Sequence, residues 1–167
     1  MDDKSKIICL TGFMGCGKSS VGKILALKLG RSFADLDDYI VSREGRSIPE
    51  IFKEGESVFR KAELAALKDY LENSPGESIL SLGGGTFTIE EARDLAIAET
   101  TTFFLRTRMD TIRQRLGDSD ASRPLFADAE RLYESRLKYY EMAKYVIDTD
   151  DLDVNQVAER IIDILSA

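Results

Sequence analysis

Histidine does not occur in this 167-residue sequence, and cysteine occurs only as Cys9 and Cys16. Without histidine the chain lacks the commonest general base and the commonest metal ligand, so we expect its acid–base chemistry to use carboxylates. The two cysteines lack a C-x-x-C spacing and are too few for a disulfide framework. We therefore expect both thiols to be reduced.

Long apolar runs and an excess of positive charge are also missing. No apolar run approaches the roughly 20 residues that span a bilayer, so we expect no membrane contact. The first residues run straight into a strand-like stretch that begins at Lys6, which leaves no room for a signal peptide and predicts a cytoplasmic protein. The net charge of −7 argues against a nucleic-acid partner, whose phosphates need a basic face. Small anionic ligands remain possible where a few arginines converge.

Strand-like and helix-like segments alternate along the chain. Short apolar runs predict strands at 6–10, 33–36, 78–82, 101–105 and 146–148. Helical spacing predicts helices at 18–29, 48–52, 57–71, from Thr88 to about 98, after Thr107 or Asp110 as a cap, and at 132–143 and 154–165. Capping boxes are expected at Thr88 with Glu91 and at Asp153 with Gln156.

This alternation predicts an α/β fold with three layers, in which helices cover both faces of a five-stranded, mostly parallel sheet. No repeat or shift in composition divides the chain, so residues 1–167 are expected to form a single domain. The least regular stretch, at about 117–128, is expected to be mobile.

The first predicted strand leads into a phosphate-binding loop. Residues 12–19, with the sequence GFMGCGKS, match the P-loop pattern G-x-x-x-x-G-K-[ST] at every fixed position. Glycines let successive N–H groups point inward around phosphate oxygens, and the following helix adds its positive end. Lys18 is expected to reach the β- and γ-phosphates, and the Ser19 hydroxyl to ligate Mg²⁺.

Cys16 lies inside this loop and has two interpretations. It could be a thiol activated at a helix N-terminus, where thiol pKa values fall. We favour the simpler one, a small side chain at a place where bulk would block phosphate.

Carboxylates follow the second predicted strand, at the edge of the sheet where α/β proteins bind ligands. Asp35 and Asp37 alternate there, and alternation in an extended segment would put both on one side. One could serve Mg²⁺ and the other could orient or deprotonate an acceptor hydroxyl, whereas Asp38 is the better candidate for a helix cap.

Further along, Gly83-Gly84-Gly85 follows the third predicted strand, and glycine allows free φ angles and close approach of the backbone to a ligand. A flexible turn would look the same. Arg60, Arg123 and Arg136 could meet an anionic ligand, or they could pair with surface carboxylates.

Taken together, these segments resemble the shikimate kinase family over nearly the whole chain. The resemblance is carried by residues 12–20 (GFMGCGKSS), 33–37 (FADLD), 48–52 (IPEIF), 55–60 (GESVFR), 83–85 (GGG) and 123–125 (RPL). It implies ATP-dependent phosphorylation of the 3-hydroxyl of shikimate, on the pathway to aromatic amino acids. It also implies a P-loop NTPase fold of the nucleoside-monophosphate-kinase type with a mobile lid, at about 117–128.

The resemblance further implies roles for individual residues. Asp37 would contact the shikimate hydroxyls as base or orienter, and Lys18 and Arg123 would complete the catalytic set. The remaining shikimate contacts would come from Arg60 and Arg136, which clamp the carboxylate, and from Gly83, Gly84 and Gly85 along the ring. Arg115 would stack on adenine, and Ser19 and Asp35 would serve Mg²⁺. The full ATP-binding set would be Gly12, Met14, Gly15, Cys16, Gly17, Lys18, Ser19, Ser20, Arg115 and Arg123. The partners would be ATP and shikimate, bound by a monomer.

The sequence departs from the family pattern at two places. Cys16 stands where Ser, Thr or Ala is more frequent, and Asn155 stands roughly where the adenine-binding loop, which opens at Asp148-Thr149, often has proline.

Two alternatives to this assignment stay open. A related small-molecule kinase, such as a gluconate kinase, could use the same loop on another acceptor. A regulatory module could have kept nucleotide binding and lost catalysis, although Asp37, Arg60 and Arg136 are all present.

Overall fold

The computed structural model describes residues 6–74, 76–116 and 123–167, and a parallel sheet forms its centre. The five strands pair side by side in the order β2 (Ser32–Asp35), β3 (Ser78–Ser81), β1 (Ile7–Thr11), β4 (Thr101–Arg106) and β5 (Tyr145–Asp148). Every pairing is parallel, so all strands end at the same edge. The predicted strands are confirmed to within one residue at each end, because short apolar runs bounded by polar residues mark buried strands clearly.

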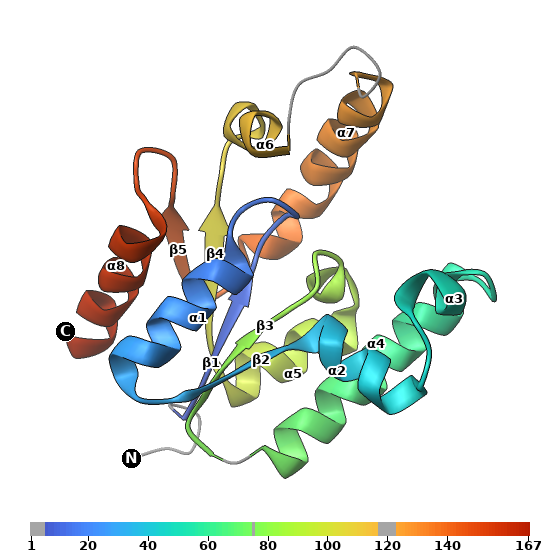
Figure 1. Ribbon diagram of the computed structural model, residues 1–167, viewed down its shortest axis with the longest axis horizontal. Coiled ribbons are helices and arrows are strands. Elements are labelled where there is room, and N and C mark those ends of the chain that lie inside the picture. The colour runs from blue at the N-terminus through green and yellow to red at the C-terminus, as the bar shows by residue number, and fades with distance from the viewer. Residues whose placement is uncertain (1–5, 75, 117–122) are drawn as a thin grey trace.

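Helices lie on both sides of the sheet (Figure 1), which confirms the predicted three-layer fold. On one side α1 (Lys18–Leu29) packs beside α8 (Val154–Ser166). The other side carries α4 (Glu56–Asn73), α5 (Glu90–Glu99) and α7 (Arg123–Tyr140), joined by the shorter α2 (Leu36–Glu44), α3 (Ile48–Phe52) and the 3₁₀ helix η2 (Thr86–Thr88). Helix α6 (Met109–Leu116) follows β4. No described helix combines the length and apolarity that crossing a bilayer requires.

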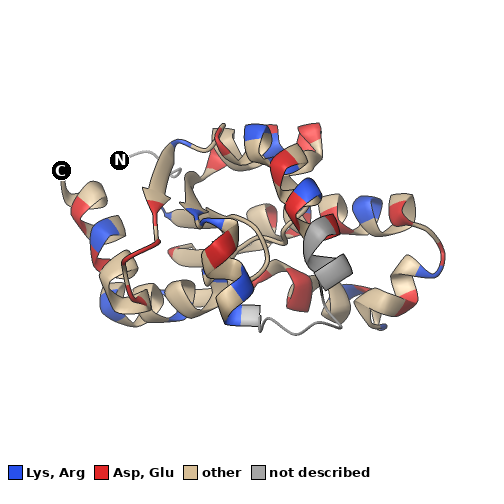
Figure 2. Cartoon of the chain, turned by 90° about the horizontal axis from the view of Figure 1, so that it is seen from above, with Lys and Arg blue, Asp and Glu red and all other residues tan. Residues whose placement is uncertain are grey.

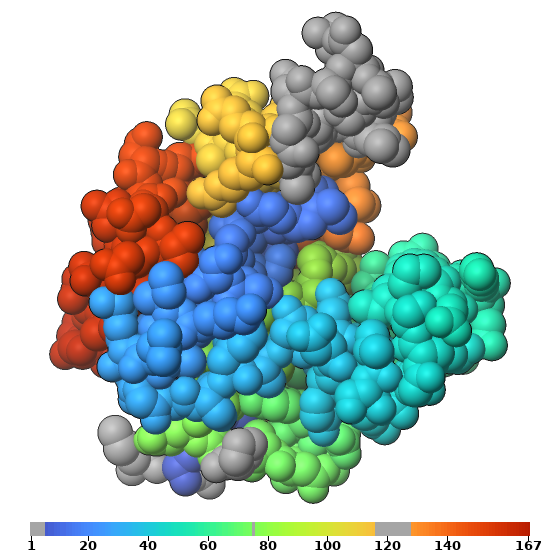
Figure 3. Space-filling model, in the orientation of Figure 1, coloured from blue at the N-terminus to red at the C-terminus, as the bar shows by residue number. Residues whose placement is uncertain are grey.

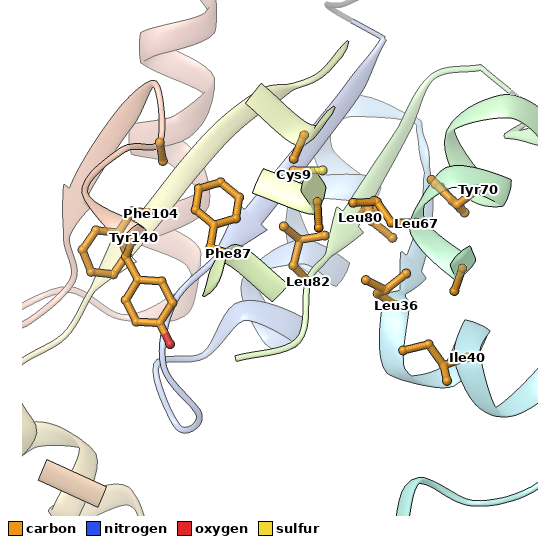
Figure 4. Packing of buried hydrophobic residues seen from close by; sticks show 14 of the residues in the cluster. Cys9, Leu36, Ile40, Leu67, Tyr70, Leu80, Leu82, Phe87, Phe104 and Tyr140 are labelled. Atoms are coloured by element: carbon orange, nitrogen blue, oxygen red, sulfur yellow. The ribbon is translucent and has the colours of Figure 1, made fainter. Parts of the chain in front are cut away.

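The core divides into two clusters because side chains alternate across each strand. Ile8 and Leu10 of β1 pack with the buried faces of α1 and α8. Cys9, between them, packs on the opposite side with Leu80 and Leu82 (Figure 4). Each sheet face is thus buried under its own helices, which fixes the strand register and hence the position of the loops that follow the strands.

Two helices differ from the sequence-based expectation. Helix α2 was not predicted, because it buries only Leu36 and Ile40 and so carries a weak periodic signal. Helix α7 was expected over 132–143 but spans Arg123–Tyr140. The Arg123-Pro124 pair had suggested an irregular segment, whereas proline is tolerated in the first turn of a helix.

Of the helix caps predicted at Asp153, Thr88 and Thr107, one is confirmed and two are wrong. The capping box of Asp153 and Gln156 at the start of α8 is confirmed. The box at Thr88 is wrong, because the Thr88 hydroxyl donates to the carbonyl of Gly85 at 2.6 Å, and α5 begins without a side-chain cap. Thr107 does not cap α6 either, since its hydroxyl lies 2.6 Å from that of Thr149. Instead, the Asp150 carboxylate accepts a hydrogen bond from the backbone N–H of Arg108 at 3.0 Å.

Gly22 provides a test of how closely α1 packs on β2. A Cβ atom at this position would lie 2.5 Å from the Phe33 ring. We therefore expect Gly22→Ala to lower the free energy of unfolding by about 1–3 kcal/mol through overpacking, although alanine is the better helix former. Urea unfolding measures this. Leu27→Ala, on the exposed face of the same helix (83% exposed), is the control and should change stability by less than about 0.5 kcal/mol. A Gly22→Ala variant as stable as the wild type would contradict this packing.

Candidate active site

The loop between β1 and α1 has the backbone conformation that its glycines predict. Gly12, Gly15 and Gly17 have φ angles of 150°, 80° and 95°, in the region that favours glycine. Gly17 is the N-cap of α1, and no side chain caps the N–H groups of this helix end. These groups therefore face the loop, where a phosphate can accept their hydrogen bonds.

Lys18 and Cys16 lie close together at this loop, with the Lys18 ammonium 3.9 Å from the Cys16 sulfur. The Lys18 ammonium donates to the carbonyl oxygens of Gly12 at 2.7 Å and Phe13 at 3.2 Å. The Cys16 side chain is buried in the core cluster under α1, and a Cβ on Gly12 would lie 2.8 Å from its sulfur. A larger residue at position 16 would therefore displace Gly12. Of the other predicted loop residues, Met14 and Ser20 are exposed.

The carboxylates after β2 meet the loop from the side. Ser19 Oγ donates to Asp35 Oδ2 at 2.9 Å, and Asp35 Oδ1 accepts from the backbone N–H groups of Asp37 at 2.9 Å and Asp38 at 3.3 Å. The expected extended alternation of Asp35 and Asp37 is therefore wrong: the strand ends at Asp35, which caps α2, and Asp38 is not the cap. Asp37 instead lies in the first helical turn, and it lines the same cavity as Asp35.

The pKa of Asp37 is raised to about 6. Burial is the main cause, and the negative charges of Asp35 and Glu63 add to it, while Lys18 opposes the shift. A carboxylate with a pKa near 6 is ionised at neutral pH yet basic enough to accept a proton.

The glycine triplet after β3 lies against the charged side chains of the site. A Cβ would lie 3.0 Å from the Asp37 carboxylate at Gly83, 3.5 Å from the Arg136 guanidinium at Gly84, and 2.4 Å from that of Arg60 at Gly85. None of the three has a positive φ angle. Gly83 and Gly85 are therefore explained by close approach rather than by free φ angles, whereas a Cβ on Gly84 would make only an ordinary van der Waals contact.

Arg60, on α4, is held by a buried carboxylate. Its guanidinium donates to Glu63 at 2.7 Å, and Glu63 also accepts from the Thr86 hydroxyl at 2.7 Å. Glu63 is fully buried, and these two donors satisfy its carboxylate oxygens. Glu56 adds a longer and more exposed contact to Arg60, at 3.5 Å.

A cavity of about 320 Å³ joins all these elements. Figure 3 shows it as a recess between the phosphate loop and the α3–α4 region. Its polar lining includes Lys18, Ser19, Asp35, Asp37, Arg60, Glu63 and Arg136, its backbone lining includes Gly83–Gly85, and its apolar lining includes Met14, Ile48, Phe52, Phe59 and Leu82. Acidic and basic residues are interspersed along the described helices (Figure 2).

A second cavity of about 470 Å³ opens on the other side of the phosphate loop. It lies between α6 and the loop after β5, and it is lined by Arg108, Asp110, Thr111, Gln114, Arg115, Thr149, Asp150, Asp151 and Leu152. Arg115 donates to the carbonyl of Gly15 at 3.0 Å, which links this cavity to the phosphate loop. Asn155 does not line it but lies in the first turn of α8, with Glu159 at 3.5 Å.

Comparison with known proteins identifies the family. The sequence model of the shikimate kinase family matches residues 14–166. This chain belongs to the shikimate kinase family. It is 34% identical to a shikimate kinase of Bacillus pumilus, over 97% of this chain and 90% of that protein. It is 39% identical to one of Thermus thermophilus, over 93% and 88%.

Solved structures agree with this assignment. The shikimate kinase of Acinetobacter baumannii, determined in complex with shikimate, superposes with a TM-score of 0.86 at 32% identity, over 98% of this chain and 94% of that one. The shikimate kinase of Aquifex aeolicus gives a TM-score of 0.82 at 35% identity. The match covers nearly the whole chain, including the phosphate loop and the helices around the first cavity, so the P-loop fold predicted from the sequence is confirmed.

The structure brings together most, but not all, of the site residues expected from the sequence. Lys18, Asp35, Asp37, Arg60, Gly83–Gly85 and Arg136 share one cavity, and Arg115 lies at the other. The Arg123 side chain and residues 117–122 are outside the described part of the structure. Glu63 and the stacked pair Phe52–Phe59, 4.6 Å apart, were missed. Only the i, i+3 spacing from Arg60 hinted at Glu63.

The raised pKa of Asp37 predicts a pH-dependent gain in stability for Asp37→Asn. An unfolded aspartate ionises near 3.8, whereas folded Asp37 ionises at about 6. Wild-type stability therefore falls as pH rises from 4 to 6, because the folded state must hold a charge that it disfavours. At pH 7.5 we expect Asp37→Asn to be more stable by about 1 kcal/mol, since partial solvation reduces the full effect.

Urea unfolding between pH 3.5 and 7.5 measures this difference. The gain should shrink below pH 6 and disappear below pH 4. Asp38→Asn, at the exposed neighbouring position, is the control and should show a much smaller gain, because the Asp38 charge is the smallest of the causes that raise the pKa of Asp37. A gain of the same size at every pH would exclude the charge of Asp37 as its cause.

Proposed function

We infer that this protein transfers the γ-phosphoryl group of ATP to the 3-hydroxyl of shikimate, giving shikimate 3-phosphate and ADP for aromatic amino-acid biosynthesis. One observation carries this conclusion: in a member of the shikimate kinase family, the phosphate loop and a pair of arginines line a single cavity. The donor and the acceptor of a phosphoryl transfer have to meet in this way.

The acceptor half of the cavity suits a small cyclic hydroxy acid. Arg60 and Arg136 can each bind a carboxylate through charge-assisted hydrogen bonds. The stacked Phe52 and Phe59 rings offer an apolar wall to the carbon ring. Gly83–Gly85 bring the backbone close to the bound ring because no side chain intervenes. Asp37 then lies where a ring hydroxyl can donate to it.

We propose that Asp37 orients the 3-hydroxyl and accepts its proton. The hydroxyl oxygen forms a bond to the γ-phosphorus while the bond from that phosphorus to the oxygen bridging it to the β-phosphorus breaks, and the electron pair leaves on ADP. Lys18 neutralises charge that develops on the transferred group. This scheme needs no histidine, in agreement with the composition.

Ser19 and Asp35 have the donor types that Mg²⁺ prefers. Among the described residues, no group of three or more His, Cys, Asp or Glu side chains is arranged so that it could hold a metal ion by itself. That finding fits a nucleotide-bound Mg²⁺, which usually takes one or two protein ligands and completes its shell with phosphates and water. The hydroxyl and carboxylate oxygens lie 2.9 Å apart at the base of the phosphate loop. Ser19 and Asp35 would hold Mg²⁺ there, and the ion would supply positive charge against that of the phosphates.

The nucleotide base is assigned to the second cavity, beside Arg115. We further propose that the protein acts as a cytoplasmic monomer, since one chain supplies both the donor half and the acceptor half of the cavity beside the phosphate loop. The single-domain assignment of residues 1–167, with a lid at about 117–128 and a catalytic role for Arg123, stays a prediction.

A substrate panel tests the function. ADP release from ATP and Mg²⁺ should depend on shikimate, and should stay at background with gluconate or nucleoside monophosphates. Asp37→Asn should lose most turnover while its ATP affinity, measured by calorimetry, stays nearly unchanged. Turnover with gluconate in place of shikimate would indicate a related kinase. ATP binding without shikimate binding would indicate a regulatory module.

Arg136→Ala tests the carboxylate clamp. The variant removes a charge-assisted hydrogen bond worth roughly 1.5–3 kcal/mol, so the KM for shikimate should rise about 10- to 100-fold. The KM for ATP should change little, because Arg136 lies on the acceptor side. Steady-state kinetics with each substrate varied in turn gives both values. Unchanged shikimate affinity would remove Arg136 from the site.

A further inference from the structure

The last turns of α7 are fixed to the glycine triplet by a buried tyrosine. Tyr140 is fully buried, and its hydroxyl donates to the carbonyl of Gly84 at 2.5 Å. Its ring packs against Phe104, with centroids 5.1 Å apart. Figure 4 shows the hydroxyl pointing away from the apolar side chains of this cluster. The ring of Tyr140 therefore packs in the core, and its hydroxyl binds the backbone of the glycine triplet.

The same hydroxyl is close to the carboxylate clamp. Tyr140 and Arg136 are four residues apart on α7 and so share one helix face. A Cβ on Gly84 would lie 3.5 Å from the Arg136 guanidinium, so both side chains reach the same glycine. Burial raises the pKa of Tyr140 to about 12, and Arg136 opposes this shift through its charge and through hydrogen bonding.

Gly84 also lies beside the donor half of the site. Its Cβ position is 3.8 Å from the backbone nitrogen of Met14 and 3.9 Å from the carbonyl oxygen of Gly12. A shift of Gly84 would therefore change the distance between the clamp and the phosphate loop. Such a displacement matters, because phosphoryl transfer depends on the positions of donor and acceptor.

We propose that Tyr140 is a positioning residue for the acceptor carboxylate, whose hydroxyl fixes Gly84 and the Arg136 guanidinium relative to each other. The expected effect of Tyr140 on the KM for shikimate rests on the proposed function. The expected effect on the stability of the turn after Gly84 does not. A second contact keeps the helix in place without this hydroxyl. Arg93 donates to the carbonyl of Phe87 at 3.0 Å and lies 5.0 Å from the Tyr139 ring centroid. We therefore expect Tyr140→Phe to fold.

The first experiment measures amide hydrogen exchange in the ligand-free protein by NMR. The N–H groups of Thr86, Thr88 and Ile89 form the hydrogen bonds of the turn that follows the triplet. Without the anchor on Gly84, this turn should open more readily, so these amides should exchange about 3- to 10-fold faster in Tyr140→Phe. Tyr70→Phe is the matched control, because it removes another buried hydroxyl, bonded to Ser78 at 2.7 Å, from a residue that does not line the cavity.

The second experiment is steady-state kinetics. Tyr140→Phe should raise the KM for shikimate about 3- to 10-fold, and should change kcat and the KM for ATP less than about 2-fold. In an Arg136→Ala background the same change should add less than about 2-fold, because the group that it positions is gone. Tyr70→Phe should leave every constant unchanged.

The outcomes of these experiments distinguish a failure of the proposed function from a failure of the positioning role of Tyr140. A wild-type protein that does not turn over shikimate would overturn the proposed function. An unchanged exchange rate in Tyr140→Phe would overturn the positioning role, whatever acceptor the wild type uses. An equal rise in KM with and without Arg136 would also overturn it, because the hydroxyl would then act independently of the clamp.

Discussion

The site depends on the pairing of two adjacent parallel strands, β1 and β3. Leu10 lies opposite Ser81 in this pairing, and the N–H of Leu82 continues it by donating to the carbonyl of Leu10 at 2.9 Å. Both strands end at the same edge, so the phosphate loop and the glycine triplet leave the sheet side by side. The direction of the crossover connections also reverses between these two strands. The chain runs from β1 across β3 to β2, and from β3 across β1 to β4. Crevices at such points are the usual ligand sites of parallel sheets.

Charges of both signs are concentrated in this crevice at a cost to stability. Glu63 is buried and balanced by Arg60 and Thr86, whereas Asp37 lies near two other carboxylates and has a raised pKa. A core built only for stability would exclude such groups. In the proposed function, this arrangement places a base next to a carboxylate clamp. The free-energy cost of burying these charges is offset by the two apolar clusters that pack the sheet between its helices.

Several local features were predictable because their causes are local. The β1–α1 loop needs positive φ angles at three glycines, and the sequence places glycine at each one. The capping box at Asp153 depends on a residue only three positions away. The cap at Thr88 failed because a nearer carbonyl, that of Gly85, takes its hydroxyl. Likewise the N–H of Arg108, just before α6, donates to Asp150, a residue distant in sequence that no local pattern could identify.

The sequence by itself determined the phosphate loop, the strand positions, the carboxylate chemistry and the family resemblance, because these depend on residue type and short spacing. Only the tertiary structure decided that Asp35 caps a helix, that the glycine triplet lies against charged side chains, and that Glu63 and Tyr140 hold the groups around them. The physical reason is distance along the chain. Tyr140 and Gly84 are 56 positions apart, and only the packing of α7 beside the loop after β3 brings them into contact.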